Sequence, residues 1–314
     1  MSDTKIALLD DRGVVRVSGE DATAFLDNLV TQDVTGMAEG EARFAALLTP
    51  QGKILFDFFV VRTVDGYLLD VARGKAAELV KRLTLYKLRA KVAIDDMSNY
   101  VCTWVIWASG DMHAIQSNGS ITTFPSPVAA YQEPRQPIFG MVEWRHIIDV
   151  AQSETTMAMA KARQIDVGDY RTRRISLGIP EGGKDYAFGD AFPHEVNMDR
   201  LNGVSFTKGC FVGQEVVARM QHKTVVRKRI VKVTGAAPLM SGAAIKVGEA
   251  TIGAVGSVAG NAGLAMLRLD RVIEANDKGQ AITSDGQPLT VDGEPLELYR
   301  AESAAKAEVK AARI

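Results

Sequence analysis

The chain has 314 residues, of which 46% are hydrophobic and 24% charged, and its formal charge at pH 7 is -1. These proportions are typical of folded domains, and they exclude a disordered or collagen-like chain. A charge this small provides no overall attraction to nucleic acid or anionic membranes. The length predicts two or three domains. Because no apolar run approaches the roughly 18 residues of a membrane helix, we expect no membrane segment.

Strand and helix patterns alternate along the first half of the chain, which predicts an α+β architecture. The helices are recognised by apolar residues at helical spacing, and the strands by short apolar runs between turn residues. The expected elements are a strand over 13–17, a helix with an acidic first turn within 19–34, a hairpin around 50–52, a strand over 66–72, a helix over 75–89, a loop over 109–137 and a helix near 152–166.

A different pattern begins near residue 228, where short apolar runs are separated by glycines. Regular short strands of this kind predict a small β-barrel. The Ala-rich tail, 301–314, is either a terminal helix or disordered. We therefore expect an N-terminal α+β domain over 1–125, a second α+β region over 126–227, and a C-terminal β-barrel with its tail over 228–314.

Cysteine and histidine positions restrict the metal chemistry and the compartment. The two cysteines, Cys102 and Cys210, cannot form a disulfide framework, and no CxxC or paired Cys/His spacing is present. The histidines are scattered, so we expect no intrinsic metal site. The start of the chain shows neither a signal-peptide nor a transit-peptide pattern, and together with the cysteine use this predicts a cytoplasmic protein.

The segment over 170–229 combines turn residues, carboxylates, a cysteine and a basic run in what reads as one long connection. Long ordered connections are often functional. Cys210 lies beside Lys208 and the start of a helix, which favours a reactive thiolate, although a small buried residue in a tight turn is the alternative. For the basic run that includes Arg219 and Arg227, two interpretations remain open: a solvated surface and an anion-binding site. The absence of aromatic residues over 212–235 disfavours direct nucleic-acid binding.

One motif in this segment carries a specific resemblance. It resembles K-G-C-[YF]-x-G-Q-E, the hallmark of the YgfZ-type folate-binding family, bacterial relatives of a mitochondrial iron–sulfur assembly factor. The wider superfamily is that of the glycine-cleavage aminomethyltransferase. The resemblance implies mixed α/β N-terminal domains around a central folate pocket and a small C-terminal β-barrel. The matching residues are Lys208, Gly209, Cys210, Phe211, Gly213, Gln214 and Glu215.

The same resemblance implies a folate site. The transferase has a T-P-x-E segment whose glutamate binds the pterin, and FPHE at 192–195 falls at the matching place. Glu195 would accept two adjacent pterin N–H groups in a two-pronged hydrogen bond. The family's Asp-Pro-Arg is Glu-Pro-Arg here, which leaves Arg135 as an anion contact. Lys208, Arg219 and Arg227 complete the expected contacts to folate.

The function implied is that of a tetrahydrofolate-binding accessory protein for iron–sulfur cluster assembly or repair, supporting cluster-dependent enzymes that include tRNA-thiolating ones. Cys210 would be the reactive thiol. Because a cluster needs about four ligands, a transient cluster would be shared with a partner protein or glutathione. The expected partners are folate and iron–sulfur assembly or client proteins.

Two alternatives remain open. The first is a folate-dependent aminomethyltransferase or demethylase acting on a small amine, with Glu78 roughly in register with the transferase's aspartate. A glutamate on a helical face is a poor candidate for a general base, so enzymatic activity is not favoured. The second alternative is a regulatory folate sensor without chemistry at Cys210.

Overall fold

The computed structural model describes residues 4–108, 128–135, 143–159 and 162–311. The chain forms two compact units. Unit 1 comprises 1–48, 55–169 and 200–212, and unit 2 comprises 49–54, 170–199 and 213–314. Two short segments, 49–54 and 200–212, therefore belong to a different unit from the sequence on either side of them.

Unit 1 contains two five-stranded sheets. The first has the strand order β3-β4-β5-β2-β6, and the second β10-β1-β7-β9-β8. The strands of the first sheet are β2 (Arg12–Ser18), β3 (Ala42–Leu48), β4 (Ile54–Thr63), β5 (Gly66–Ala72) and β6 (Ala93–Asp96). Those of the second are β1 (Thr4–Leu9), β7 (Val101–Ala108), β8 (Ala129–Gln132), β9 (Glu143–Asp149) and β10 (Arg163–Gln164).

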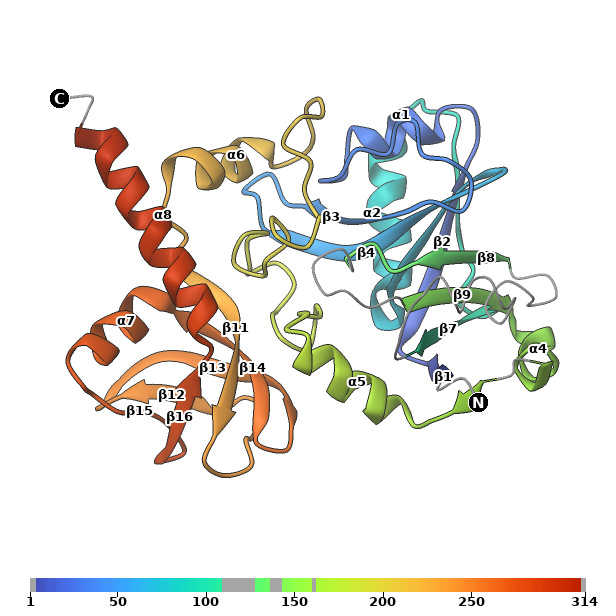
Figure 1. Ribbon diagram of the computed structural model, residues 1–314. Helices are drawn as coiled ribbons and strands as arrows, with labels where there is room; N and C mark the ends of the chain where they lie inside the picture. The colour runs from blue at the N-terminus through green and yellow to red at the C-terminus, as the bar shows by residue number, and fades with distance from the viewer. Residues whose placement is uncertain (1–3, 109–127, 136–142, 160–161, 312–314) are drawn as a thin grey trace. The chain divides into compact units, whose positions relative to one another are not determined.

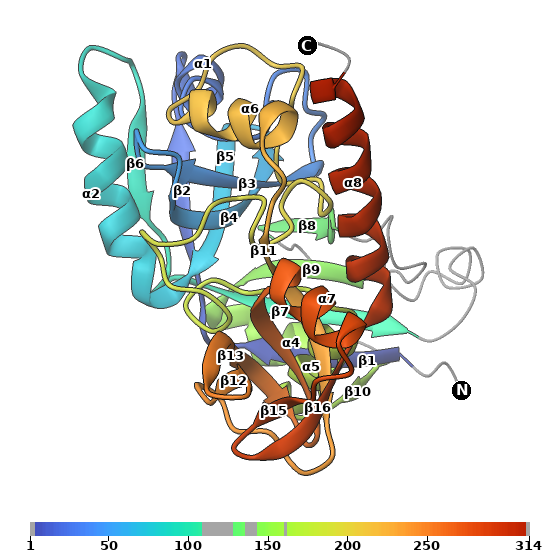
Figure 2. The same cartoon turned by 90° about the vertical axis from the view of Figure 1, so that its left-hand side faces the viewer.

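Helices α1 (Ala22–Asp27) and α2 (Ala76–Lys87) contribute to the hydrophobic core of the first sheet. α2 buries Ala76, Leu79 and Leu83, whose spacing places them on one helical face. It lies against β2 and β6, as Figure 2 shows, and Figure 1 gives its place among the other elements. Short helical segments η1 (Arg73–Lys75), η3 (Val150–Gln152) and α4 (Ser153–Met159) complete the described part of this unit.

The strand predicted over 13–17 and the helix predicted over 75–89 correspond to β2 and α2. The helix expected within 19–34 spans only Ala22–Asp27, and it has no acidic residue in its first turn because Glu20 and Asp21 precede it. The helix near 152–166 ends at Met159, since β10 then pairs in parallel with β1. Most of the loop predicted over 109–137 lies outside the described residues, and its described part contains β8.

Unit 2 is built on a closed barrel with the strand order β11-β14-β13-β12-β15-β16, drawn in orange to red in Figure 1. Pairing of β11 with β16 closes it. The predicted barrel is thus confirmed, and the tail forms a helix. The elements of this unit are α5 (Val167–Ser176, which begins in unit 1), α6 (Gln214–Lys223), β11 (Lys228–Gly235), β12 (Ala244–Val247), β13 (Ala250–Ala259), β14 (Ala262–Arg268), α7 (Leu269–Asp277), β15 (Ile282–Ser284), β16 (Gln287–Val291) and α8 (Gly293–Ala311).

The boundary expected between 125 and 126 lies outside the described residues. Strands from both sides of it, β7 and β9, pair in one sheet. The segment over 170–229, expected as a connection, contains most of α5 and all of α6.

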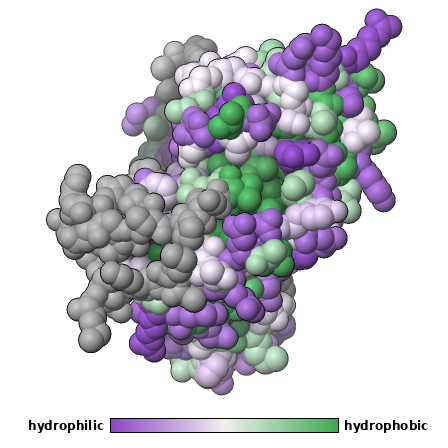
Figure 3. Space-filling view, turned by 90° about the vertical axis from the view of Figure 1, so that its right-hand side faces the viewer, coloured by the Kyte–Doolittle hydropathy of each residue, from purple (hydrophilic) through white to green (hydrophobic). Residues whose placement is uncertain are grey.

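No helix in the described ranges has the length and apolar character needed to cross a membrane. One face of the molecule is seen in Figure 3, where hydrophilic residues surround a smaller hydrophobic patch.

Candidate functional site

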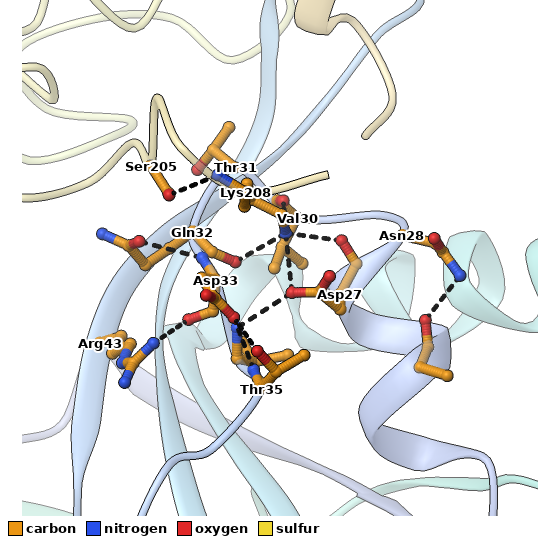
Figure 4. Close-up of polar contacts among 12 residues, drawn as sticks. Asp27, Asn28, Val30, Thr31, Gln32, Asp33, Thr35, Arg43, Ser205 and Lys208 are labelled. Carbon is orange, nitrogen blue, oxygen red and sulfur yellow. Dashed lines mark hydrogen bonds and ion pairs between the residues drawn. The ribbon is translucent and has the colours of Figure 1, made fainter. Parts of the chain in front are cut away.

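The Cys210 segment, residues 205–212, is held in unit 1 by a buried lysine. The ammonium of Lys208 donates to the carbonyl oxygens of Asp27 at 2.6 Å, Val30 at 3.0 Å and Gln32 at 3.0 Å (Figure 4). It also lies 3.0 Å from the Asp27 carboxylate, and its side chain is 1% exposed. Burial lowers the pKa of Lys208 below its ordinary value, and the contact with Asp27 opposes only part of this effect. The lysine contacts the chain itself rather than solvent.

Further hydrogen bonds hold residues 202–205, at and just before the start of the Cys210 segment, against the loop that follows α1. The Thr31 hydroxyl donates to the carbonyl of Gly203 at 2.6 Å, and the Ser205 amide donates to the carbonyl of Thr31 at 2.9 Å. The Gln32 side chain donates to the carbonyl of Asn202 at 2.9 Å. These bonds join residues about 170 positions apart in the sequence.

Cys210 is exposed, which contradicts the alternative of a small buried residue. Phe211, directly after it, is buried, and its ring centroid lies 5.6 Å from the Lys208 ammonium. Val212 then packs against the core of unit 1. The exposed pair Gly209 and Cys210 therefore lies between the buried side chains of Lys208 and Phe211.

Gly209 has no conformational reason to be glycine. Its φ is not positive, and a Cβ built there would meet nothing within 4 Å. No atom of the described chain comes close enough to Gly209 to require a residue without a side chain. Gly213 differs, because its φ of 81° is left-handed and it forms the N-cap of α6.

Glu195 lies in a turn of unit 2, and its carboxylate is partly engaged. Its Oε2 accepts a hydrogen bond from the Phe192 amide at 2.9 Å, and its own amide donates to the Phe192 carbonyl at 3.0 Å. The Ile230 amide, at the start of the barrel, donates to the Glu195 carbonyl at 2.8 Å. Oε1 makes no hydrogen bond within the described part of the chain. One carboxylate oxygen is thus fixed, while the other is available.

A buried arginine supports this turn. Arg229 makes a two-pronged contact with Asp199, at 2.9 and 2.7 Å, and donates to the carbonyl of His194 at 2.6 Å. Asn197, whose φ is 62°, donates to the carbonyl of Ile230 at 2.8 Å. We did not predict this arrangement. An arginine at a buried strand position requires a carboxylate partner, and that requirement is the signal that could have indicated the contact with Asp199.

The turn, α6 and the hairpin residues 49–54 pack together within unit 2. The His194 ring nitrogen lies 3.0 Å from the amide oxygen of Gln221 on α6. The Ile54 amide donates to the carbonyl of Ala191 at 2.9 Å. Gly52, with a φ of 80°, lies so near Val216 that an added Cβ would be 2.8 Å from the Val216 Cβ. The FPHE and GQE motifs therefore share one packed region.

The remaining predicted contacts to folate fall into two groups, exposed residues and a buried one. Arg219 and Arg227 belong to the exposed group. Glu215 is also exposed, in the first turn of α6, and Gln214 is the first residue of that helix. Arg219 lines a shallow hollow of about 300 Å³ on α6. The other residues of the hollow are Glu215, Ala218, His222 and Lys223.

Arg135 belongs to the second group, because it is buried and used internally. It contacts both oxygens of Glu133, at 2.7 and 2.9 Å, and its guanidinium lies 4.7 Å from the centroid of the Phe59 ring. Burial of Glu133 favours its neutral form, but the charges of Arg135 and Arg145 overcome this and lower the pKa of Glu133 to about 2.

Glu78, the residue considered for the transferase alternative, is about half exposed and lies 2.6 Å from the Lys75 ammonium. This surface ion pair does not favour Glu78 as a general base.

The second cysteine, Cys102, is half-buried in β7, with its sulfur 3.3 Å from the Ser153 hydroxyl.

Comparison with known proteins defines the fold first. Residues 6–109 match the GCVT N-terminal domain, and residues 227–305 match the CAF17 C-terminal beta-barrel domain. The structure is similar to the glycine cleavage system aminomethyltransferase T from Bartonella henselae, with a TM-score of 0.72 and 15% identity over 94% of this chain and 86% of that one. The chain therefore has the GCVT-like aminomethyltransferase fold with a C-terminal barrel.

Sequence relatives then define the family. The human mitochondrial iron-sulfur cluster assembly factor IBA57 is 32% identical over 283 residues, covering 84% of this chain and 77% of the relative. A homologue of the same factor from Mycosarcoma maydis is 34% identical over 245 residues, covering 73% of this chain and 57% of the relative. The chain belongs to the IBA57 family of iron–sulfur cluster assembly factors. It spans a little over half the length of the fungal relatives it matches.

The relatives also correct one prediction. Their names place them in mitochondria. The prediction of a cytoplasmic protein, which rested on cysteine use and on the first residues of the chain, is therefore wrong. Neither observation identifies a reducing organelle, because cysteine use distinguishes only oxidising from reducing compartments.

Proposed function

We propose that this protein is a tetrahydrofolate-binding accessory protein for iron–sulfur cluster assembly or repair, belonging to the YgfZ-type branch, with Cys210 as its reactive thiol. Its clients would be cluster-dependent enzymes, including those that thiolate tRNA. The observation that carries the proposal is the exposure of Cys210 between the buried side chains of Lys208 and Phe211, in a member of the IBA57 family.

The proposed chemistry at Cys210 is ligation of a cluster as cargo. The whole sequence holds two cysteines, and Cys102 is half-buried in a β-strand. Because iron–sulfur clusters are held by about four ligands, Cys210 would contribute one thiolate, and a partner protein or glutathione would contribute the others. An exposed thiol suits this role, since the other ligands must approach it from outside the chain.

The proposed folate contacts are revised by the geometry. Glu195 fits a pterin, because its carboxylate is held in place and its Oε1 can accept a further N–H donor. The exposed Arg219 and Arg227 would meet the glutamate tail. Lys208 and Arg135 are left out, since their donors are directed to groups of the chain. Bound tetrahydrofolate would supply a pterin ring that carries one-carbon units or donates electrons.

Folate titration tests this pocket. Glu195→Gln replaces one acceptor oxygen with an amide, and we expect it to weaken tetrahydrofolate binding by roughly 10- to 100-fold, the size of a lost charge-assisted hydrogen bond. Glu249→Gln, at an exposed glutamate of the barrel, is the matched control and should bind as the native protein does. Equal affinities for all three proteins would contradict the pocket.

Complementation tests the thiol. In cells lacking this gene, we expect Cys210→Ser to fail to restore the activities of cluster-dependent enzymes under oxidative stress, whereas Cys102→Ser restores them. Full restoration by Cys210→Ser would favour a folate sensor without thiol chemistry instead.

A further inference from the structure

The Lys208 contacts lie where α1 stops. Carbonyl groups at the end of a helix have no partner within the helix, and a cation placed there is favoured by the helix dipole. α1 ends at Asp27, and Lys208 donates to the carbonyls of Asp27, Val30 and Gln32 just beyond the last turn. This capping lysine comes from a position 181 residues later in the chain.

We propose that Lys208 is a positioning residue that fixes the thiol of Cys210 by capping the end of α1. The proposal rests on the role proposed for Cys210 above. Two consecutive Cα atoms are about 3.8 Å apart, so the Cys210 backbone lies within about 8 Å of the Lys208 backbone. With Phe211 buried on the other side, the exposed pair Gly209 and Cys210 is held at both ends.

The chemistry of the contact explains why a lysine serves here. An ammonium carries three N–H groups around one nitrogen, and these meet three carbonyl oxygens that converge from one loop. A planar guanidinium is shaped for a carboxylate and would not satisfy this arrangement. The Asp27 carboxylate, 3.0 Å away, compensates the buried charge, and it is itself held by the Val34 amide at 3.1 Å.

A fixed thiol has a functional consequence. When an outside partner brings the other cluster ligands, the ordering of flexible groups opposes association. A thiol that is already in place avoids that part of the cost. Lys208 thus acts on the geometry of Cys210. Its own positive charge is already compensated by the Asp27 carboxylate.

The test uses a Cys102→Ser background, in which Cys210 is the sole cysteine. Lys208→Met keeps the apolar stem and removes the donors. We expect amide hydrogen exchange over 205–212 to become roughly 10- to 100-fold faster, the effect of losing a buried charge-assisted contact. Lys91→Met is the control, since Lys91 is 73% exposed and pairs only with Glu20 among the described residues. Unchanged exchange in Lys208→Met would overturn the proposal.

A second measurement separates positioning from stability. The transfer of a [2Fe–2S] cluster, supplied as its glutathione complex, to an apo-ferredoxin is measured per chain that binds folate. We expect Lys208→Met to lower the maximal rate by about tenfold at unchanged folate stoichiometry, with no rescue by Lys208→Arg because of its planar donors. A native rate per folate-binding chain, or full rescue by arginine, would overturn the positioning role.

The two proposals can fail separately. If Cys210→Ser transfers the cluster normally, the proposed function of the thiol is wrong, while hydrogen exchange in Lys208→Met still decides whether the segment is held by the lysine. Should Lys208→Met fail to fold, Asp27→Asn weakens the same contact and leaves the carbonyls in place. A several-fold rise in exchange over 205–212 is then expected, and no rise would contradict the role.

Discussion

The segment at 205–212 and the turn at 192–199 are built in a similar way. Each is held by one buried cation that donates to main-chain carbonyls and has a carboxylate partner. In unit 1 the pair is Lys208 and Asp27, and in unit 2 it is Arg229 and Asp199. The choice of cation follows its acceptors, because the ammonium meets three separate carbonyls whereas the guanidinium meets both oxygens of one carboxylate.

The two regions differ in what they present. The turn presents Glu195 with one oxygen fixed by the Phe192 amide, which suits directional recognition of a small ligand. The segment presents Cys210 exposed to solvent, which suits a thiol that completes a ligand set brought by a partner. A buried cation therefore supports both groups, the half-buried Glu195 carboxylate in the turn and the exposed Cys210 thiol in the segment.

Arg229→Met should break the turn. Removing one partner of a buried ion pair leaves the Asp199 carboxylate without its cation and takes one donor from the His194 carbonyl, and we expect a loss of roughly 3–5 kcal/mol in the free energy of unfolding. Chemical denaturation measures the loss. Arg227→Met, which changes an exposed arginine nearby, is the control and should differ from the native protein by less than about 0.5 kcal/mol. Similar stabilities for both variants would show that the turn does not depend on Arg229.

Gly52→Ala should disturb the packing of the hairpin residues 49–54 on α6. The left-handed φ of 80° and the 2.8 Å approach to Val216 both oppose a side chain there. We expect a loss of about 2 kcal/mol, measured by denaturation, together with weaker folate binding. Gly36→Ala is a control with a positive φ of 66° but no atom within 4 Å, and it should lose less. An equal loss in both would assign the effect to backbone strain alone.

Acid should loosen the turn before it loosens the Cys210 segment. Burial lowers the pKa of His194 below the ordinary histidine value of 6.5, so in mild acid the unfolded chain binds a proton more readily than the native turn does. The stability that this histidine contributes is present above pH 6.5 and is lost as the pH falls through its lowered native pKa. Hydrogen exchange over 192–199 should accelerate in acid, and His194→Gln should remove that dependence. His222→Gln, at an exposed position, should keep it.

Gly209→Ala should leave the stability unchanged within about 0.5 kcal/mol, because the new methyl meets no atom of the described chain. If a cluster-bearing partner approaches the backbone beside Cys210, the methyl would obstruct it. We therefore expect slower cluster transfer at unchanged thermal stability. A native transfer rate would show that the approach to the thiol leaves this position free.

Parts of the fold could be predicted because their patterns are local. The apolar positions of α2 repeat at helical spacing, and the glycine-separated runs after residue 228 indicate a barrel. The helix expected within 19–34 is shorter than its apolar pattern, because the chain after Asp27 turns to pair with β3, where Val30 bridges to Leu47 and the Thr31 amide donates to the Ala46 carbonyl. Arg135 could not be interpreted from sequence, since burial turned an apparent anion contact into a partner of Glu133.

The mixed α+β class, the C-terminal barrel and the identity of the motif residues can be predicted from sequence alone, since they depend on periodicity, turn residues and a short contiguous pattern. Tertiary structure decided which of those residues are available to a ligand. Lys208 and Arg229 find carbonyls and carboxylates that lie up to 181 residues away in the chain. Burial converts these cations from potential ligand contacts into supports, and only folding brings their partners together.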